Sequence, residues 1–306
     1  MKRDHLHIGY ILVFVLVLSL YAGCSTSQTT ATQSNFRFGT QALDMEWKSN
    51  NQNRVFIGDD LILLLQLNNR GTADITNGQL YLSGYDPSYL NLQIEPSPSF
   101  TMPGKSQFDP NGDFSDLYTL RATNVKGPQN VNQFQQSILV AACYDYETTA
   151  VASVCIDSDP YNKITRQKAC TMTTVSVGGQ GAPVVVSSVE PVVGQNSVRF
   201  NIRLANSGGG VVFDPRISLD VCGQGLSFEN TDRVVVSKVT LGGKSLDCTP
   251  QNPIWLNSGS ASFTCECQGD GCIDPNVPAY QTLLEVDLRY GYRNSLATQV
   301  TVMNNN

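Results

Sequence analysis

Two segments of the chain repeat the same arrangement of residues, and this repeat constrains the fold more than any other feature. In each copy a glycine precedes a seven-residue strand that ends in leucine, and an Asn-x-Gly turn follows. The predicted strands are Leu61–Leu67 and Val198–Leu204, with turns at 69–71 and 206–208. Because Asn and Gly tolerate positive φ, Asn-x-Gly after a strand indicates a turn. The sequence therefore predicts two copies of one structural unit.

Each copy also ends on a matching pair of tyrosines. Tyr-x-Tyr closes a predicted strand at 144–146 and again at 290–292. Equivalent turns lie 137 positions apart and equivalent tyrosines 146, so the register between the copies is nearly kept. We expect a turn after each pair and then another strand, at 150–156 and 297–303. The paired tyrosines alternate onto one face, where a phenol often anchors a corner of immunoglobulin-like folds.

The residues between these landmarks are short β-rich runs separated by turn residues. No stretch after the N-terminal segment keeps a helical period of apolar residues. We therefore predict an all-β chain with two tandem immunoglobulin-like β-sandwiches after an N-terminal signal or anchor segment. The first sandwich covers 36–178 and the second 184–306. Glycines and Pro183 disfavour sheet pairing in 179–183, so this segment is the predicted linker.

The first copy also carries a family resemblance. The segment 55–82 contains Gly58-Asp59 and, after its strand, Asn69-Arg70-Gly71-Thr72-Ala73-Asp74. These residues resemble the cell-adhesion-related domain of bacteria and archaea, which has an immunoglobulin-like fold. The order of the segments is similar to uncharacterised archaeal surface proteins. The resemblance implies a surface or scaffolding role without catalysis and assigns no functional residue. The chain departs from the family in a long insertion, 83–136, and in its many cysteines.

The N-terminus predicts export. Lys2 and Arg3 precede an apolar run of about the length of a secretory signal core, and Tyr21-Ala22-Gly23-Cys24 resembles a lipobox. On this interpretation 1–24 is a signal peptide and Cys24 is the lipidation site. An uncleaved membrane anchor, with Cys24 as an ordinary thiol, and simple secretion are the alternatives. The Ser-, Thr- and Gln-rich segment 25–35 follows as a flexible tether. All three interpretations place the folded body outside the cytoplasm.

The eight cysteines after Cys24 indicate disulfides, since an even number in an exported chain is typical of them. Local spacing favours three pairs and elimination leaves the fourth: Cys155–Cys170, Cys248–Cys265, Cys267–Cys272 and Cys143–Cys222. The predicted boundary separates three cysteines from five, so either one bridge crosses it or two thiols stay free. A metal site at Cys265-Glu266-Cys267 with Cys272 is disfavoured, because zinc sites usually carry C-x2-C.

The folded body contains no histidine, because His5 and His7 both precede the apolar run. This excludes histidine-dependent nucleophiles and histidine-ligated metals there. Oxygen ligands remain, and the weak calcium candidates are Asp109, Asn111, Asp113, Asp157 and Asp159. The first three imitate a calcium loop but lack its later glycine and glutamate, which favours a polar turn. We predict no cofactor and no catalytic residue; a carbohydrate-active enzyme working through paired carboxylates is a distant alternative.

Charge and aromatic content complete the functional prediction. The net charge is −6 and no basic stripe is present, which argues against a nucleic-acid partner. Trp47, Tyr81, Tyr85 and Tyr89 are candidates for a sugar-stacking or partner surface, although core packing is the more common role. We predict a non-enzymatic, membrane-anchored cell-surface protein for recognition, adhesion or envelope scaffolding, with a protein or glycan partner. The alternative is a structural subunit of a pilus or envelope complex.

Overall fold

The structure of the chain, a computed structural model, describes residues 36–48, 52–159, 167–193, 197–268, 273 and 277–304. All of them belong to one compact unit. The predicted signal or anchor segment 1–24, the lipidation candidate Cys24 and the tether 25–35 lie outside the described residues. Within the described ranges, no helix has the length and apolar character needed to cross a membrane.

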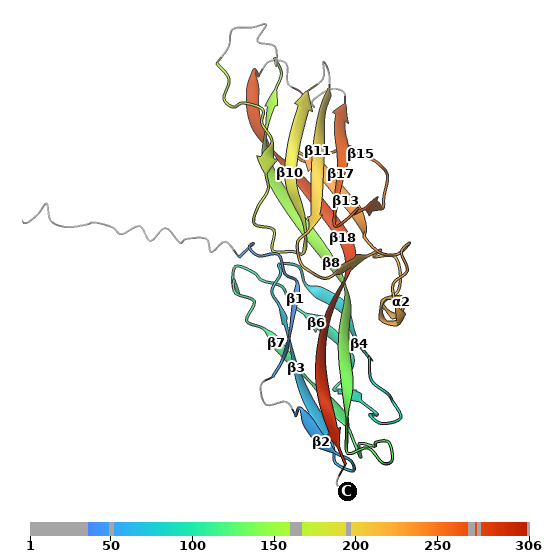
Figure 1. The fold of residues 1–306 in the computed structure, drawn as a ribbon. Helices are drawn as coiled ribbons and strands as arrows, with labels where there is room; N and C mark the ends of the chain where they lie inside the picture. The colour runs from blue at the N-terminus through green and yellow to red at the C-terminus, as the bar shows by residue number, and fades with distance from the viewer. Residues whose placement is uncertain are drawn as a thin grey trace, which may run out of the picture. The chain divides into compact units, whose positions relative to one another are not determined.

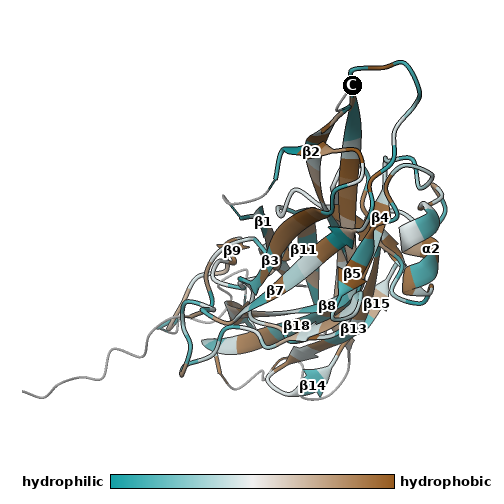
Figure 2. Cartoon of the chain, turned by 90° about the horizontal axis from the view of Figure 1, so that it is seen from below, coloured by the Kyte–Doolittle hydropathy of each residue, from teal (hydrophilic) through white to brown (hydrophobic). Residues whose placement is uncertain are grey.

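The fold is all-β and immunoglobulin-like, as predicted, and among the described residues the strands form sheets of four, five and nine strands. Hydrophobic residues, brown in Figure 2, are concentrated in these strands. The four-stranded sheet has the order β1 (Leu43–Trp47), β3 (Leu61–Asn69), β7 (Ser115–Ala122) and β5 (Gln93–Glu95). The five-stranded sheet has the order β15 (Asp247–Thr249), β17 (Ser260–Gln268), β11 (Ser197–Asn206), β10 (Val184–Val193) and β9 (Val175–Ser176).

The nine-stranded sheet contributes to both halves of the molecule. Its order is β14 (Lys244–Ser245), β13 (Arg233–Leu241), β18 (Ala279–Met303), β8 (Gln133–Asp157), β4 (Ile75–Ser83) and β6 (Ser99–Met102). The short strands β2 (Arg54–Phe56) and β12 (Val211–Phe213) pair with β18, and β16 (Ile254–Trp255) pairs with β13. The one described helix, α2 (Leu219–Gln224), lies on this sheet beside β4 and β8.

Strands β8 and β18 are each 25 residues long and pair antiparallel over their whole length (Figure 1). The turns predicted after 144–146 and 290–292 are therefore wrong, because 150–156 and 297–303 continue the same strands. The physical reason is the burial pattern of β8, whose even-numbered side chains are buried without a break from Ile138 to Ile156. A turn after Tyr146 would take the buried side chains that follow it out of the core, so the strand continues.

The two long strands interleave the halves of the sequence. The C-terminal half of β18 pairs with the N-terminal half of β8, next to β4, while its N-terminal half pairs with β13 and the rest of β8. Residues late in the chain thus complete the sheet of the first half. The division into 36–178, 179–183 and 184–306 stays a prediction. The sequence did not lead us to expect that the two halves share these long strands.

A buried tyrosine cluster, Tyr144, Tyr146, Tyr290 and Tyr292, lies where β8 and β18 pair at mid-length. The rings of Tyr144 and Tyr146 are 5.9 Å apart in an edge-to-face arrangement, and those of Tyr290 and Tyr292 are 6.2 Å apart. Such arrangements are favoured by the ring quadrupoles. Burial raises the pKa of the Tyr144 and Tyr290 phenols well above their usual value, so both keep a proton to donate.

The second tyrosine of each pair contacts the Asn-x-Gly turn of the same copy. Tyr146 donates to Asn69 Oδ1 at 3.4 Å and accepts from the Ala73 N–H at 3.3 Å. Tyr292 donates to Asn206 Oδ1 at 3.1 Å and accepts from the Gly210 N–H at 2.8 Å. The repeated motifs of the sequence are thus two ends of one contact, and the prediction that a phenol anchors a turn is confirmed.

The first tyrosine of each pair bonds across to the other copy. Tyr144 donates to Asn294 Oδ1 at 2.6 Å, and Tyr290 shares a hydrogen bond of 2.8 Å with Thr148. Thr148 and Asn294 occupy equivalent places in the two copies, 146 positions apart. The copies therefore exchange equivalent hydrogen bonds through the core, which ties the two β-sandwiches together.

Helix α2 adds a covalent tie between the halves. Cys222 of the helix is bonded to Cys143 of β8, with Cα atoms 6.3 Å apart, and this bridge crosses the predicted boundary. Tyr81 of β4 donates to Asp220 at 3.0 Å, and burial together with this hydrogen bond raises the Tyr81 pKa to about 12. Gly223 packs on the Tyr81 ring so closely that a Cβ would overlap it. A small residue is thus required where the helix meets the sheet.

Two further bridges have the pairings that spacing favoured. Cys155 is bonded to Cys170, and Cys248 of β15 is bonded to Cys265, its direct partner on β17. Cys267 is also disulfide-bonded. Its predicted partner, Cys272, lies outside the described residues.

Candidate functional site

The calcium candidates are engaged by groups of the protein itself. Both carboxylate oxygens of Asp109 accept from the Asp113 N–H, at 3.1 and 3.0 Å, and the Asn111 carbonyl accepts from Arg70. These contacts are those of a polar turn. No group of three potential metal-ligating side chains occurs in the part of the chain that the structure describes.

The second acidic pair is occupied by a lysine. The Lys168 ammonium lies 2.6 Å from an Asp157 carboxylate oxygen and 2.6 Å from the Asp159 carbonyl oxygen. The other Asp157 oxygen accepts from the Asp159 N–H at 2.9 Å. The Lys168 ammonium therefore occupies the position between Asp157 and Asp159 that a metal cation would take.

The four aromatic candidates do not form one surface. Trp47 donates its indole N–H to the Ala297 carbonyl at 3.2 Å, Tyr81 packs against α2, and Tyr89 stacks edge-to-face on Phe134 at 5.2 Å. Tyr85 packs against the hydrophobic core. These contacts are structural. Trp255, which is exposed and lines a groove, was not singled out from the sequence.

Trp255 lines a groove of about 820 Å³ on the five-stranded sheet, which we term the Trp255 groove. The floor comes from three adjacent strands, β10, β11 and β17, and the wall from the segment that connects β15 to β17. The lining residues are Ser187, Arg203, Leu204, Ala205, Pro250, Pro253, Ile254, Trp255, Asn257, Ser260, Ala261 and Ser262. Small side chains on the strands leave the floor open, since Ser and Ala project little beyond the backbone.

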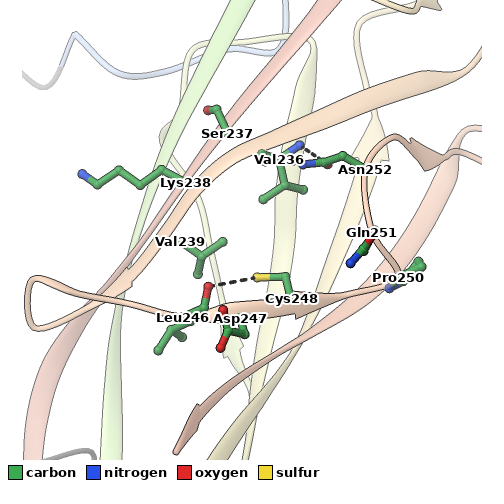
Figure 3. Close-up of a pocket in the computed structure, with 10 residues that line it drawn as sticks. All are labelled: Val236, Ser237, Lys238, Val239, Leu246, Asp247, Cys248, Pro250, Gln251 and Asn252. Carbon is green, nitrogen blue, oxygen red and sulfur yellow. Dashed lines mark hydrogen bonds between the residues drawn. The ribbon is translucent and has the colours of Figure 1, made fainter.

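The wall is a ridge, residues 249–255, that is fixed at its start and in its middle. At its start, Cys248 is bonded to Cys265. In its middle, the Asn252 side chain accepts from the Val236 N–H at 2.8 Å and donates to the Val236 carbonyl at 2.7 Å (Figure 3). The Asn252 amide thus replaces a neighbouring strand at the edge of β13. Pro250 and Pro253 add fixed φ angles, so the ridge is a stiff support for Trp255.

A second depression, of about 410 Å³, lies on the other side of the ridge between β13 and residues 246–248. Lys238 points out of it (Figure 3). Its ammonium is paired with Glu285 at 3.2 Å. The Cys248 sulfur lies 3.9 Å from the Leu246 carbonyl oxygen, but it has no proton to donate because it belongs to a disulfide. This depression has a paired charge and an occupied strand edge, so the Trp255 groove is the stronger candidate site.

Removing the Asn252 amide is expected to loosen the ridge. Asn252→Ala loses both hydrogen bonds to Val236, which costs about 1 kcal/mol and makes exchange of the Val236 amide hydrogen roughly fivefold faster. Hydrogen exchange with mass spectrometry measures this. Gln251→Ala is the matched control, because Gln251 borders the same depression without a hydrogen bond to any described residue. Equal exchange in the two variants would contradict the bracing role of Asn252.

Trp255 is held in place while remaining accessible. Its side chain is 44% exposed, Arg233 lies over the indole at 5.2 Å, and Phe228 meets it edge-to-face at 5.5 Å. Cation–π and edge-to-face contacts each stabilise the ring position. An indole that is already ordered loses little conformational entropy on binding a ligand.

The groove has a positive character in an acidic protein. Arg203 is exposed on the floor, and within the described residues its guanidinium has no ion-pair partner. None of the residues that line the groove is acidic, although the chain has a net charge of −6. The groove is therefore suited to a ligand that carries a negative charge or many hydroxyl groups.

Comparisons with known proteins give no family. No protein-family model matches the chain, and no curated protein matches it. Among solved structures, the chain is similar to the Escherichia coli chaperone DraB, at 10% identity with a TM-score of 0.22, over 73% of this chain and 86% of that chain. The Pseudomonas aeruginosa CupB2 chaperone matches at 7% identity with a TM-score of 0.20, over 83% of this chain and 100% of that one.

A Porphyromonas gingivalis protein of unknown function also matches, at 11% identity with a TM-score of 0.20, over 87% of this chain and 100% of that chain. Likenesses this low carry no argument about function. The resemblance to the cell-adhesion-related domain stays a prediction, while the all-β architecture follows from the chain's own strands.

The disulfides indicate the cellular compartment in which the protein resides. Bridges such as Cys143–Cys222, Cys155–Cys170 and Cys248–Cys265 persist where the environment is oxidising. The chain is an extracytoplasmic protein.

Proposed function

We propose that the protein is a non-enzymatic cell-surface protein, anchored to the membrane through its N-terminus, that recognises a protein or glycan partner through the Trp255 groove. The observation that carries the proposal is Trp255 itself, 44% exposed on a ridge that a disulfide and the Asn252 amide hold in place. Ordered, accessible aromatic side chains in concave sites commonly dominate binding energy.

The test is binding of the full chain, solubilised in detergent, to isolated cell envelopes. Trp255→Ala is expected to weaken binding about 10- to 30-fold, which corresponds to the loss of a central aromatic contact. Phe56→Ala is the matched control, because Phe56 is also 44% exposed but lies on β2, away from the groove. Binding that is unchanged by Trp255→Ala would overturn the proposed site.

A second candidate function is a structural subunit of a pilus or envelope complex. The pairing of β8 and β18 over 25 residues favours it, because continuous strands make a stiff spacer. A fixed partner that co-purifies with the chain, together with no binding to isolated envelopes, would support this function over recognition. The carbohydrate-active enzyme stays a distant alternative, and no side-chain pair in the Trp255 groove supports it, since its lining lacks a carboxylate.

A further inference from the structure

We propose that the Trp255 groove binds an acidic oligosaccharide, with a sugar carboxylate on Arg203 and a pyranose ring against Trp255. The inference rests on the proposed function and names the chemical class of its ligand. Three properties of the groove support it: its charge, the hydroxyl groups of its floor, and the pairing of its middle strand on both edges.

Arg203 gives the groove its positive charge. Its guanidinium is exposed in the groove, and no described residue forms an ion pair with it. The planar guanidinium fork matches a carboxylate through two parallel hydrogen bonds. Because no acidic side chain lines the groove, a carboxylate on the ligand would meet no local repulsion.

The floor of the groove carries hydroxyl groups. Ser262 lies directly opposite Arg203 in the β11–β17 pair, so the two side chains are neighbours on one face of the sheet. The Ser262 hydroxyl has no hydrogen-bond partner among the described residues. Asn257 adds amide donors to the lining, and the Ser187 hydroxyl, which donates to the Arg203 carbonyl at 3.3 Å, adds an acceptor. Sugar hydroxyls both donate and accept, so a floor of this kind suits them.

The backbone pairing of the floor disfavours a peptide ligand. Strand β11 lies between β10 and β17, and both neighbours pair with it over most of its length. The middle strand of the floor therefore offers no open edge to which a peptide could add. The apolar surface is instead provided by the wall, through Trp255, Pro250 and Pro253, where the C–H face of a pyranose can pack.

The experiment measures binding of the full chain to oligosaccharides by calorimetry. The probes are tetramers of galacturonate, glucuronate-containing hyaluronan and mannuronate, each compared with its carboxyl-reduced form. We expect at least one acidic tetramer to bind, and its carboxyl-reduced form to bind about tenfold or more weakly. Arg203→Gln is expected to remove that preference, so that the acidic and reduced forms bind equally. Trp255→Ala is expected to weaken both forms.

The matched control is Arg199→Gln, which removes the same charge from the same strand. Arg199 is exposed on the outer face of β11 but does not line the groove, so its variant is expected to bind as the wild type does. Equal loss in Arg199→Gln and Arg203→Gln would overturn the inference, because it would show only general charge attraction. Equal binding of tetraglutamate and the acidic sugars would overturn it as well.

The outcomes separate this inference from the function on which it rests. If no acidic tetramer binds while envelope binding still depends on Trp255, the ligand class is wrong and the recognition function stands. If envelope binding does not depend on Trp255, the proposed function itself fails.

Discussion

Replacing Gly71 with alanine is expected to destabilise the protein by about 3 kcal/mol, the upper end of the cost of overfilling a packed site. A Cβ at this position would overlap the Tyr146 hydroxyl and lie 2.8 Å from the Gly181 carbonyl oxygen. The tyrosine cannot move aside, because its ring is buried and its hydroxyl holds the turn that contains Gly71. Chemical denaturation of the full chain measures the change in the free energy of unfolding.

A second substitution tests the cause. In the double variant Gly71→Ala with Tyr146→Phe, the hydroxyl that the new methyl group meets is gone. The free-energy cost of the double variant should therefore be about 1 kcal/mol smaller than the sum of the two single-variant costs. Gly178→Ala is the control, because a Cβ there meets no atom within 4 Å, and its effect should be a few tenths of a kcal/mol at most. Additive costs in the double variant would show that the overlap with Tyr146 is not the reason for the glycine.

Removing the bridge between β8 and α2 is expected to cost about 4 kcal/mol. Cys143→Ser with Cys222→Ser opens a loop with a sequence separation of 79, and in the chain-entropy model the stabilisation grows with loop length. The helix itself has only six residues, so without the bridge it depends on the Tyr81 contacts. Denaturation midpoints of the full chain, with hydrogen exchange of 219–224, measure both effects.

The comparison variant for this prediction is Cys155→Ser with Cys170→Ser. That bridge has a sequence separation of 15 and should contribute about 3 kcal/mol in the same model. Exchange in 219–224 should rise in the first variant and stay unchanged in this one. If both variants released the helix equally, the Cys143–Cys222 bridge would not be what holds α2 on the sheet.

The repeat in the sequence predicted the overall architecture better than it predicted the individual turns. Asn69 and Tyr146, and their counterparts Asn206 and Tyr292, were singled out as separate landmarks and prove to be hydrogen-bonded to each other. A contact between residues far apart in the chain can be anticipated only when both residues stand out in the sequence, and these residues did. The turns expected after the tyrosines were wrong because polar residues such as Glu147 and Thr149 occupy the exposed face of a continuous strand.

The groove could not be predicted because its residues are scattered. Ser187, Arg203 and Trp255 belong to three strands, and none of them lies in a motif. The role of Asn252 also depends on where the edge of β13 passes, which no local pattern indicates. The one available signal was Trp255 beside two prolines, since a tryptophan in a proline-containing loop is seldom fully buried.

The long pairing of β8 and β18 has a consequence for the order in which the molecule matures during synthesis. Among the described strands, β18 leaves the ribosome last, and its final residues are the partners of both β2 and the start of β8. Proteins with sequential domains complete the N-terminal one while the rest is still being made. Here the N-terminal half reaches its native sheet only after β18 has emerged, so a nascent chain that still lacks β18 has neither sandwich finished.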